Sequence, residues 1–282
     1  SFFSDVFFSE PNKDYQEFIS NRDIYLRNFL NYVAHYSPWY KKVLQNISID
    51  SFTYQDLLSL PTLSKNTLME NWDEIVTDRS LTLKRVIKHL DLMSTTEDIL
   101  PLDGKYIVFS TGGSSGKKGI FVYNYHDFKK YFESTANNSH YKLREYLSLK
   151  PGEKLRTAQV SVTNTLYGLY ACSKIYCHIG EDKHYLPITL PMEKIVDRLN
   201  KIQPHRISAY PSTINLLCKE ALEKNLQIKP AIIFVAAEPL YEPIKQKIFK
   251  IWPGVLLYNF YGATEGLFAR YCRPNINYMH LD

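Results

Sequence analysis

Residues 108–123 of this chain read VFSTGGSSGKKGIFVY. An apolar run, 106–109, enters the stretch, and a β-branched and aromatic run, 120–123, leaves it. This pattern predicts a strand, a loop and a second strand. Between the two runs lie four glycines, four hydroxyl residues and two lysines. Glycines allow consecutive backbone N–H groups to turn towards one anion, and lysines add positive charge. The loop is therefore typical of a phosphate-binding site.

Two known phosphate-binding patterns do not fit this loop. Walker A requires a glycine where Thr111 stands and a Ser or Thr where Lys118 stands. The dinucleotide pattern requires a following helix, whereas residues 120–123 favour a strand. The remaining alternative is a glycine-rich hairpin turn without a ligand. The six small residues 111–116 exceed what such a turn needs, so we expect a ligand.

The composition excludes several classes of protein. The chain has 282 residues, 45% of them hydrophobic, which is enough for one large or two ordinary domains. The net charge of +5 is not gathered into a basic stripe, so no nucleic-acid partner is expected. No apolar run has the length of a membrane span, and the first residues do not resemble a signal peptide. Four cysteines are too few for a disulfide scaffold. A cytoplasmic protein without a membrane partner is expected.

Apolar periodicity organises the rest of the chain. It predicts a helix within 14–45, two short helices on either side of Pro61, and a strand at 85–90. After residue 105, strands and helices alternate. The strands are expected at 156–162, 206–209, 231–236 and 255–259, and the helices at 192–202, 213–224 and 239–252.

Strands that are almost continuously apolar and alternate with helices predict an α/β fold with mainly parallel sheets flanked by helices. We expect a helical N-terminal segment, 1–104, that packs on an α/β nucleotide-binding core, 105–282. Open α/β sheets bind ligands beyond the carboxyl ends of their strands. Two loops at such ends, 236–239 and 258–266, each pair small residues with a carboxylate. The alternatives are a helix-capping acid for Glu238 and an ordinary core aromatic for Tyr261.

The three loops, in this order, resemble those of the adenylate-forming superfamily, in particular its phenylacetate–CoA ligase and coenzyme F390 synthetase-like branch. The phosphate loop of the family is similar to 110–116, its adenine-side turn to 236–240, and its aromatic-Gly-x-Thr-Glu motif to 261–265. The resemblance extends over essentially the whole chain. It implies an ATP-dependent ligase in which a carboxylic acid attacks the α-phosphorus of ATP. The products are an acyl-adenylate and pyrophosphate, and the acyl group then passes to CoA.

The resemblance also implies roles for individual residues. Thr264 and Glu265 would be catalytic, with Glu265 holding Mg²⁺. Tyr167, Tyr210 and Pro211 would bind the acid. The expected nucleotide-binding residues are Ser110, Thr111, Gly112, Gly113, Ser114, Ser115, Gly116, Lys117, Ala236, Ala237, Glu238, Pro239, Tyr261 and Gly262.

The sequence departs from the family at its end. The family's ribose-binding acid, hinge and C-terminal lid with its lysine are absent from residues 1–282. The chain is therefore expected to be a fragment or a separately made N-terminal domain, incomplete as an enzyme. Two alternatives stay open: a non-catalytic fragment that binds nucleotide or acyl groups, and a relative that forms amides or transfers the acyl group without CoA. The resemblance also allows a homodimer. Some relatives carry a structural zinc ion near the positions of Cys272 and His280, although a free cysteine and a surface histidine are the favoured alternative.

Overall fold

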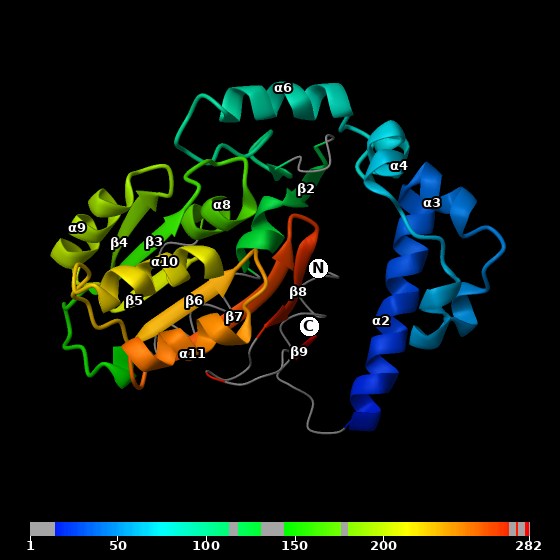
Figure 1. The fold of residues 1–282 in the computed structure, drawn as a ribbon. Helices are drawn as coiled ribbons and strands as arrows, with labels where there is room; N and C mark the ends of the chain where they lie inside the picture. The colour runs from blue at the N-terminus through cyan, green and yellow to red at the C-terminus, as the bar shows by residue number, and fades with distance from the viewer. Residues whose placement is uncertain are drawn as a thin grey trace. The chain divides into compact units, whose positions relative to one another are not determined.

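The computed structural model describes residues 15–112, 118–130, 144–175, 180–270, 275 and 280–281 (Figure 1). The chain divides into two compact units. The first comprises Ser1–Thr96 and Leu100–Tyr131, and the second comprises Glu97–Ile99 and Phe132–Asp282. Within the described ranges, no helix combines the length and the apolar character that crossing a membrane requires.

The first unit begins with the helices that the sequence predicts. Helix α2 (Tyr15–Tyr36) buries Leu30 and Val33 against Leu44 and Phe52. Ser37 then caps the next helix, α3, by accepting a hydrogen bond from the Tyr40 N–H at 3.3 Å. The short helices of this part are α3 (Pro38–Val43), η1 (Ile49–Ser51), η2 (Tyr54–Ser59), α4 (Lys65–Glu70) and α5 (Trp72–Ile75). The predicted helices within 14–45 and around Pro61 are confirmed.

The strand predicted at 85–90 is wrong. These residues belong to helix α6 (Leu83–Met93), which buries Val86, Leu90 and Met93. The helix begins where the Thr82 hydroxyl accepts a hydrogen bond from the Arg85 N–H at 3.3 Å. The spacing of the buried residues is that of one helical face, and the Thr cap satisfies a backbone donor that the first turn leaves free.

The two strands predicted around 108–123 are confirmed. Strands β1 (Tyr106–Ser110) and β2 (Ile120–Asn124) form an antiparallel hairpin in which Ser110 pairs with Ile120. All five residues of β1 are buried. The Trp72 indole donates a hydrogen bond to the Ile120 carbonyl at 3.1 Å, which ties the hairpin to α5. The hairpin therefore belongs to the first unit.

A carboxylate joins the start of this hairpin to the segment before α6. Asp78 accepts hydrogen bonds from the Ser80 hydroxyl at 2.7 Å, the Lys105 ammonium at 2.9 Å and the Tyr106 hydroxyl. These bonds, the one from the Ser80 hydroxyl above all, hold the pKa of the Asp78 carboxyl below its ordinary value. These hydrogen bonds therefore contribute fully to the free energy of unfolding at pH values above the pKa of Asp78 in the unfolded chain. Their contribution is lost as the pH falls through the lower pKa of Asp78 in the folded chain.

Asp78→Asn is expected to lower the free energy of unfolding at pH 7 by about 1–3 kcal/mol, because charge-assisted hydrogen bonds are lost. The difference between parent and variant should shrink as the pH falls below about 4. Urea titrations at several pH values measure it. Asp91→Asn, which changes an exposed aspartate on α6, is the control and should have little effect. A difference that stays constant down to pH 2 would contradict the assignment.

The second unit is built on a seven-stranded sheet in the order β4-β3-β5-β6-β7-β8-β9. The strands from β4 to β7 in this order are parallel, and β8 and β9 are antiparallel additions. Their bounds are β3 (Leu155–Ser161), β4 (Glu181–Pro187), β5 (Arg206–Ala209), β6 (Ile232–Ala236), β7 (Leu256–Ala263), β8 (Gly266–Arg270) and β9 (His280–Leu281). The predicted α/β fold with a mainly parallel sheet is confirmed.

Three helices cover one face of this sheet: α9 (Met192–Ile202), α10 (Pro211–Leu222) and α11 (Glu242–Ile251) (Figure 1). Leu199, Leu217 and Ile248, one from each helix, are fully buried in one cluster with Ile207 and Ile233 of the sheet. This apolar layer fixes where each strand ends and where the following helix begins.

The opposite face carries buried charges at the amino ends of the strands. Arg206 donates to both carboxylate oxygens of Glu181, at 3.1 and 3.2 Å, and the Lys183 ammonium lies 3.8 Å from the same carboxylate. The side chains of Glu181, Lys183 and Arg206 are only 0%, 9% and 12% exposed. Removing one partner of such a group leaves a buried charge uncompensated.

Glu181→Gln is expected to lower the free energy of unfolding by about 3–5 kcal/mol, since two buried cations lose this counter-charge. The neighbouring Asp182, whose side chain is 45% exposed beside His184, provides the matched control. Asp182→Asn should cost less than about 1 kcal/mol. Equal effects of the two substitutions in urea unfolding would show that burial of the charge is not decisive.

Candidate functional site

The carboxyl ends of the parallel strands bring most of the predicted site residues to one edge of the second unit. Ala209 pairs with Val235 in the sheet, and Ala236 pairs with Phe260. The segments that follow β3, β5, β6 and β7 therefore emerge side by side. These segments and the last residues of the strands contain Tyr167, Tyr210, Pro211, Ala236, Ala237, Glu238, Pro239, Tyr261, Gly262, Thr264 and Glu265.

Strand β7 is longer than predicted and ends in a hairpin. The expected strand ended at Asn259, but β7 continues to Ala263 and pairs with β8, with a register shift between Tyr261 and Gly262. Thr264 and Glu265 form the turn at the tip of this hairpin, and the Glu265 side chain is exposed. Tyr261, Gly262 and Ala263 of the aromatic-Gly-x-Thr-Glu motif, which the sequence places in a loop, thus belong to strand β7.

Tyr261 is 58% exposed, so it is not an ordinary core aromatic. Its neighbours on the same strand have a different environment. The rings of Tyr258 and Phe260 lie 5.2 and 5.3 Å from the ring of Phe234. The rings of Phe234, Tyr258 and Phe260 thus pack together near the carboxyl ends of β6 and β7. The ring of Tyr261 is exposed, and a planar base can stack on it.

The turn after β6 is connected to helix α10. The carboxylate of Glu238 accepts hydrogen bonds from the Ser212 N–H and the Ser212 hydroxyl, both at 3.0 Å. Glu238 is therefore a helix-capping acid, as in the alternative considered from the sequence, but it caps α10 and not the helix that follows it. Ala237, next to it, has a φ of +69°.

The residues expected to bind the acid occupy the starts of two helices. Tyr210 precedes α10, Pro211 is its first residue, and Tyr167 immediately precedes α8 (Gly168–Ile175). The Tyr210 hydroxyl accepts a hydrogen bond from the Val162 N–H at 3.4 Å. The segments after β3 and β5 are thereby joined at the carboxyl edge.

Asn259 is a polar residue at this edge that the sequence analysis missed. It is 7% exposed, and no donor among the described residues reaches its side-chain oxygen Oδ1. A buried acceptor without a partner costs about 1–3 kcal/mol, so it suits an N–H group of a ligand. The signal in the sequence was a lone amide within the otherwise apolar and aromatic run 256–260.

The glycine-rich stretch that the sequence predicts to bind phosphate lies between β1 and β2 of the first unit. Thr111 pairs with Gly119 across the base of the loop: its N–H donates to the Gly119 carbonyl at 2.9 Å, and its hydroxyl accepts from the Gly119 N–H at 2.8 Å. Ser110 is buried, and Gly112 is exposed. Gly113, Ser114, Ser115, Gly116 and Lys117 lie outside the described residues. The base of the loop is therefore defined by Ser110 and Thr111.

The cysteines that can be described are not nucleophiles. Burial raises the pKa of the Cys172 thiol to about 12 and that of Cys218 to about 11, so both are protonated at neutral pH. No group of three or more His, Cys, Asp or Glu side chains suited to a metal occurs in the described part of the chain. Cys272 lies outside it, and the zinc site stays a prediction.

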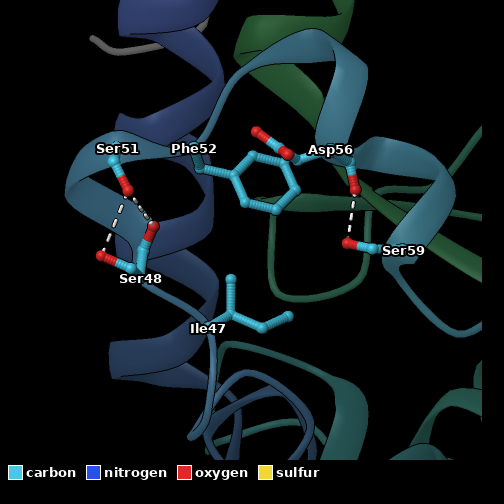
Figure 2. A pocket seen from close by; sticks show the side chains of 6 residues that line it. All are labelled: Ile47, Ser48, Ser51, Phe52, Asp56 and Ser59. Carbon is cyan, nitrogen blue, oxygen red and sulfur yellow. Dashed lines mark hydrogen bonds between the residues drawn. The ribbon is translucent and has the colours of Figure 1, made fainter.

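A depression of about 340 Å³ lies in the first unit between η1 and η2 (Figure 2). Its polar groups are used locally. The Ser51 hydroxyl donates to Ser48, the Ser59 hydroxyl donates to the Asp56 carbonyl, and the Asp56 carboxylate accepts from the Thr53 N–H at 2.8 Å. The contact between Asp56 and Thr53 caps η2, and the depression contains none of the predicted site residues.

Solved structures of a CoA ligase share the fold of this chain. 2-Hydroxyisobutyryl-CoA ligase, in an open conformation with 2-HIB-AMP and CoA, matches 93% of this chain and 57% of its own with a TM-score of 0.61 and 15% identity. The same ligase in the thioesterification state matches 92% and 52% with a TM-score of 0.60 and 16% identity. The chain has the fold of the adenylate-forming enzymes.

The sequence relationships within this fold are distant. No family model of known proteins matches the chain. Protein CapK of Staphylococcus aureus is 22% identical over 249 residues, which are 84% of this chain and 48% of CapK. The chain thus spans about half the length of the curated and structural relatives that it matches. The comparisons show an adenylate-forming fold without assigning a branch or a substrate.

Proposed function

We propose that this chain is the nucleotide-binding part of an ATP-dependent ligase that converts a carboxylic acid into an acyl-adenylate and then a CoA thioester. The single observation that carries the proposal is the carboxyl edge of the parallel sheet. There the 236–239 turn, the exposed ring of Tyr261 and the Thr264–Glu265 tip follow two neighbouring strands. The fold is shared with a ligase solved with an acyl-adenylate and CoA, which supports the same chemistry.

The residues of this edge suit the parts of the nucleotide. Tyr261 would stack on adenine, and the Ala236–Pro239 turn would line the base. The Asn259 oxygen would accept a hydrogen bond from a base N–H. Thr264 would contact the α-phosphate. In the first unit, Ser110, Thr111 and the glycine-rich loop are proposed, taken by themselves, as a site for phosphate groups. Glu265 is an exposed carboxylate, a ligand type that Mg²⁺ accepts together with phosphate oxygens and water.

The chain would act mainly by positioning and charge neutralisation. The acid's carboxylate oxygen attacks the α-phosphorus, the bond to the bridging oxygen breaks, and pyrophosphate leaves with the electron pair. No protein nucleophile is needed, which agrees with the protonated Cys172 and Cys218. Bound Mg²⁺ would supply positive charge to the phosphates. Tyr167, Tyr210 and Pro211 would hold the acid, for which we propose an aryl or apolar side chain. A cytoplasmic location is proposed as well.

The proposal predicts acid-dependent exchange of labelled pyrophosphate into ATP, tested with a panel of aryl and aliphatic carboxylic acids. Because the chain spans half of its relatives, the exchange is expected to be slow in the chain itself and faster when it is joined to any C-terminal continuation that its gene encodes. Products formed with CoA and with an amine distinguish thioester from amide formation. Nucleotide binding without exchange for any acid, in both forms, would instead support the non-catalytic alternative.

Glu265→Gln is expected to lower the exchange rate at least about 100-fold, since loss of a metal-held charge in phosphoryl chemistry costs several kcal/mol. The thermal midpoint should hardly change, because Glu265 lies exposed at a hairpin tip. Glu242→Gln, at another exposed carboxylate, is the control and should retain the parent rate. Near-parent exchange by Glu265→Gln at saturating Mg²⁺ would remove Glu265 from the metal site.

A further inference from the structure

A contact between two loops of the second unit fixes the turn at 236–239. Glu238 lies 26 residues after Ser212, yet both of its carboxylate oxygens accept hydrogen bonds from that residue, at 3.0 Å each. Pro211, the first residue of α10, has no N–H, so the Ser212 N–H is the first free donor of this helix. Glu238 satisfies that donor with a negative charge, which the positive end of the helix dipole favours.

The backbone beside Glu238 needs such a restraint. Ala237 adopts a φ of +69°, a left-handed conformation that is unfavourable for any residue with a Cβ. On its other side, Ala236 is held in the sheet opposite Phe260. The turn is therefore fixed at one end by β6 and at the other by the bond of Glu238 to α10.

The same contact limits which further groups Glu238 and the amino end of α10 can bind. Each oxygen of the Glu238 carboxylate is already engaged with one donor of Ser212. The Ser212 N–H at the amino end of α10 is likewise already bound, so it is not available to a phosphate. The Glu238 carboxylate and the Ser212 N–H are therefore not arranged to bind the nucleotide directly.

We propose that Glu238 is a positioning residue of the nucleotide site, which acts through Ser212 and the Ala237 backbone and not by contact with the nucleotide. The inference rests on the proposed function, because it takes the 236–239 turn as the wall of the adenine pocket. Loss of the contact releases the left-handed conformation of Ala237, and the turn no longer has the shape that receives the base.

The first test measures the dissociation constant for ATP·Mg²⁺ by calorimetry. Glu238→Ala should weaken binding about ten-fold, because charge-assisted hydrogen bonds of typical strength are lost. Ser212→Ala should weaken it about three-fold, because the Ser212 N–H remains. The double variant should bind no more weakly than Glu238→Ala, since the two side chains act through the same contact. Glu242→Ala, which changes a carboxylate four residues further along at the start of α11, is the matched control and should bind like the parent.

The second test is a rescue. Glycine adopts a positive φ without the steric penalty that alanine meets. Without a hydrogen bond to hold the turn, however, glycine also samples more backbone conformations. In the Ser212→Ala background, where one bond to Glu238 remains, Ala237→Gly should therefore recover binding to within about two-fold of the parent. A general loss of stability would not be repaired by this substitution. Binding that is unchanged in Glu238→Ala, or equally weak in Glu242→Ala, would overturn the proposal.

The third test separates this inference from the proposed function. Backbone hydrogen exchange of residues 236–240 is followed without any ligand, and Glu238→Ala should accelerate it about ten-fold relative to the parent. Unchanged exchange would overturn the restraint whatever the activity of the chain. A parent that fails to bind ATP·Mg²⁺ but shows the accelerated exchange in the variant would overturn the nucleotide site and leave the restraint standing.

Discussion

The parallel pairing of β3, β4, β5, β6 and β7 is the constraint on which the rest of this structure depends. Parallel strands must be joined by connections that return to the same starting edge, so all their carboxyl ends meet at one side. Tyr167, Tyr210, Glu238 and Glu265 are thereby brought to a single edge although they lie far apart in the sequence. Without this register, the two motifs after β6 and β7 would have no reason to be neighbours.

The two faces of the sheet contribute differently. One face buries an apolar layer with α9, α10 and α11, which sets the position of each helix start. The other carries Glu181, Lys183 and Arg206 at the amino ends, away from the candidate site at the carboxyl ends. The charged group thus lies at the amino ends of the strands. The exposed Tyr261 and Glu265 lie at, or just beyond, the carboxyl end of β7, where the candidate site is.

Local pattern predicted much of this fold from the sequence. Helix α9 and strand β5 occur at the predicted residues, and strands flank the glycine-rich stretch as predicted. Helix α6 was missed because its apolar spacing was taken for that of a strand, although Val86, Leu90 and Met93 share a helical face. The extension of β7 depends on β8, and the partner of Glu238 lies 26 residues away. Tertiary contacts of this kind leave no local signal. The domain division at residue 104 and the roles of the site residues stay predictions.

Photolabelling with 8-azido-ATP and Mg²⁺, followed by peptide mapping, tests most directly whether the carboxyl edge of the sheet holds the nucleotide. Because the azide is on the adenine ring, it reports where the base lies. The structure predicts labels within 236–241 and 258–266 that unlabelled ATP suppresses. Suppressible labels confined to the amino edge, at 180–183 or 203–206, would contradict the account.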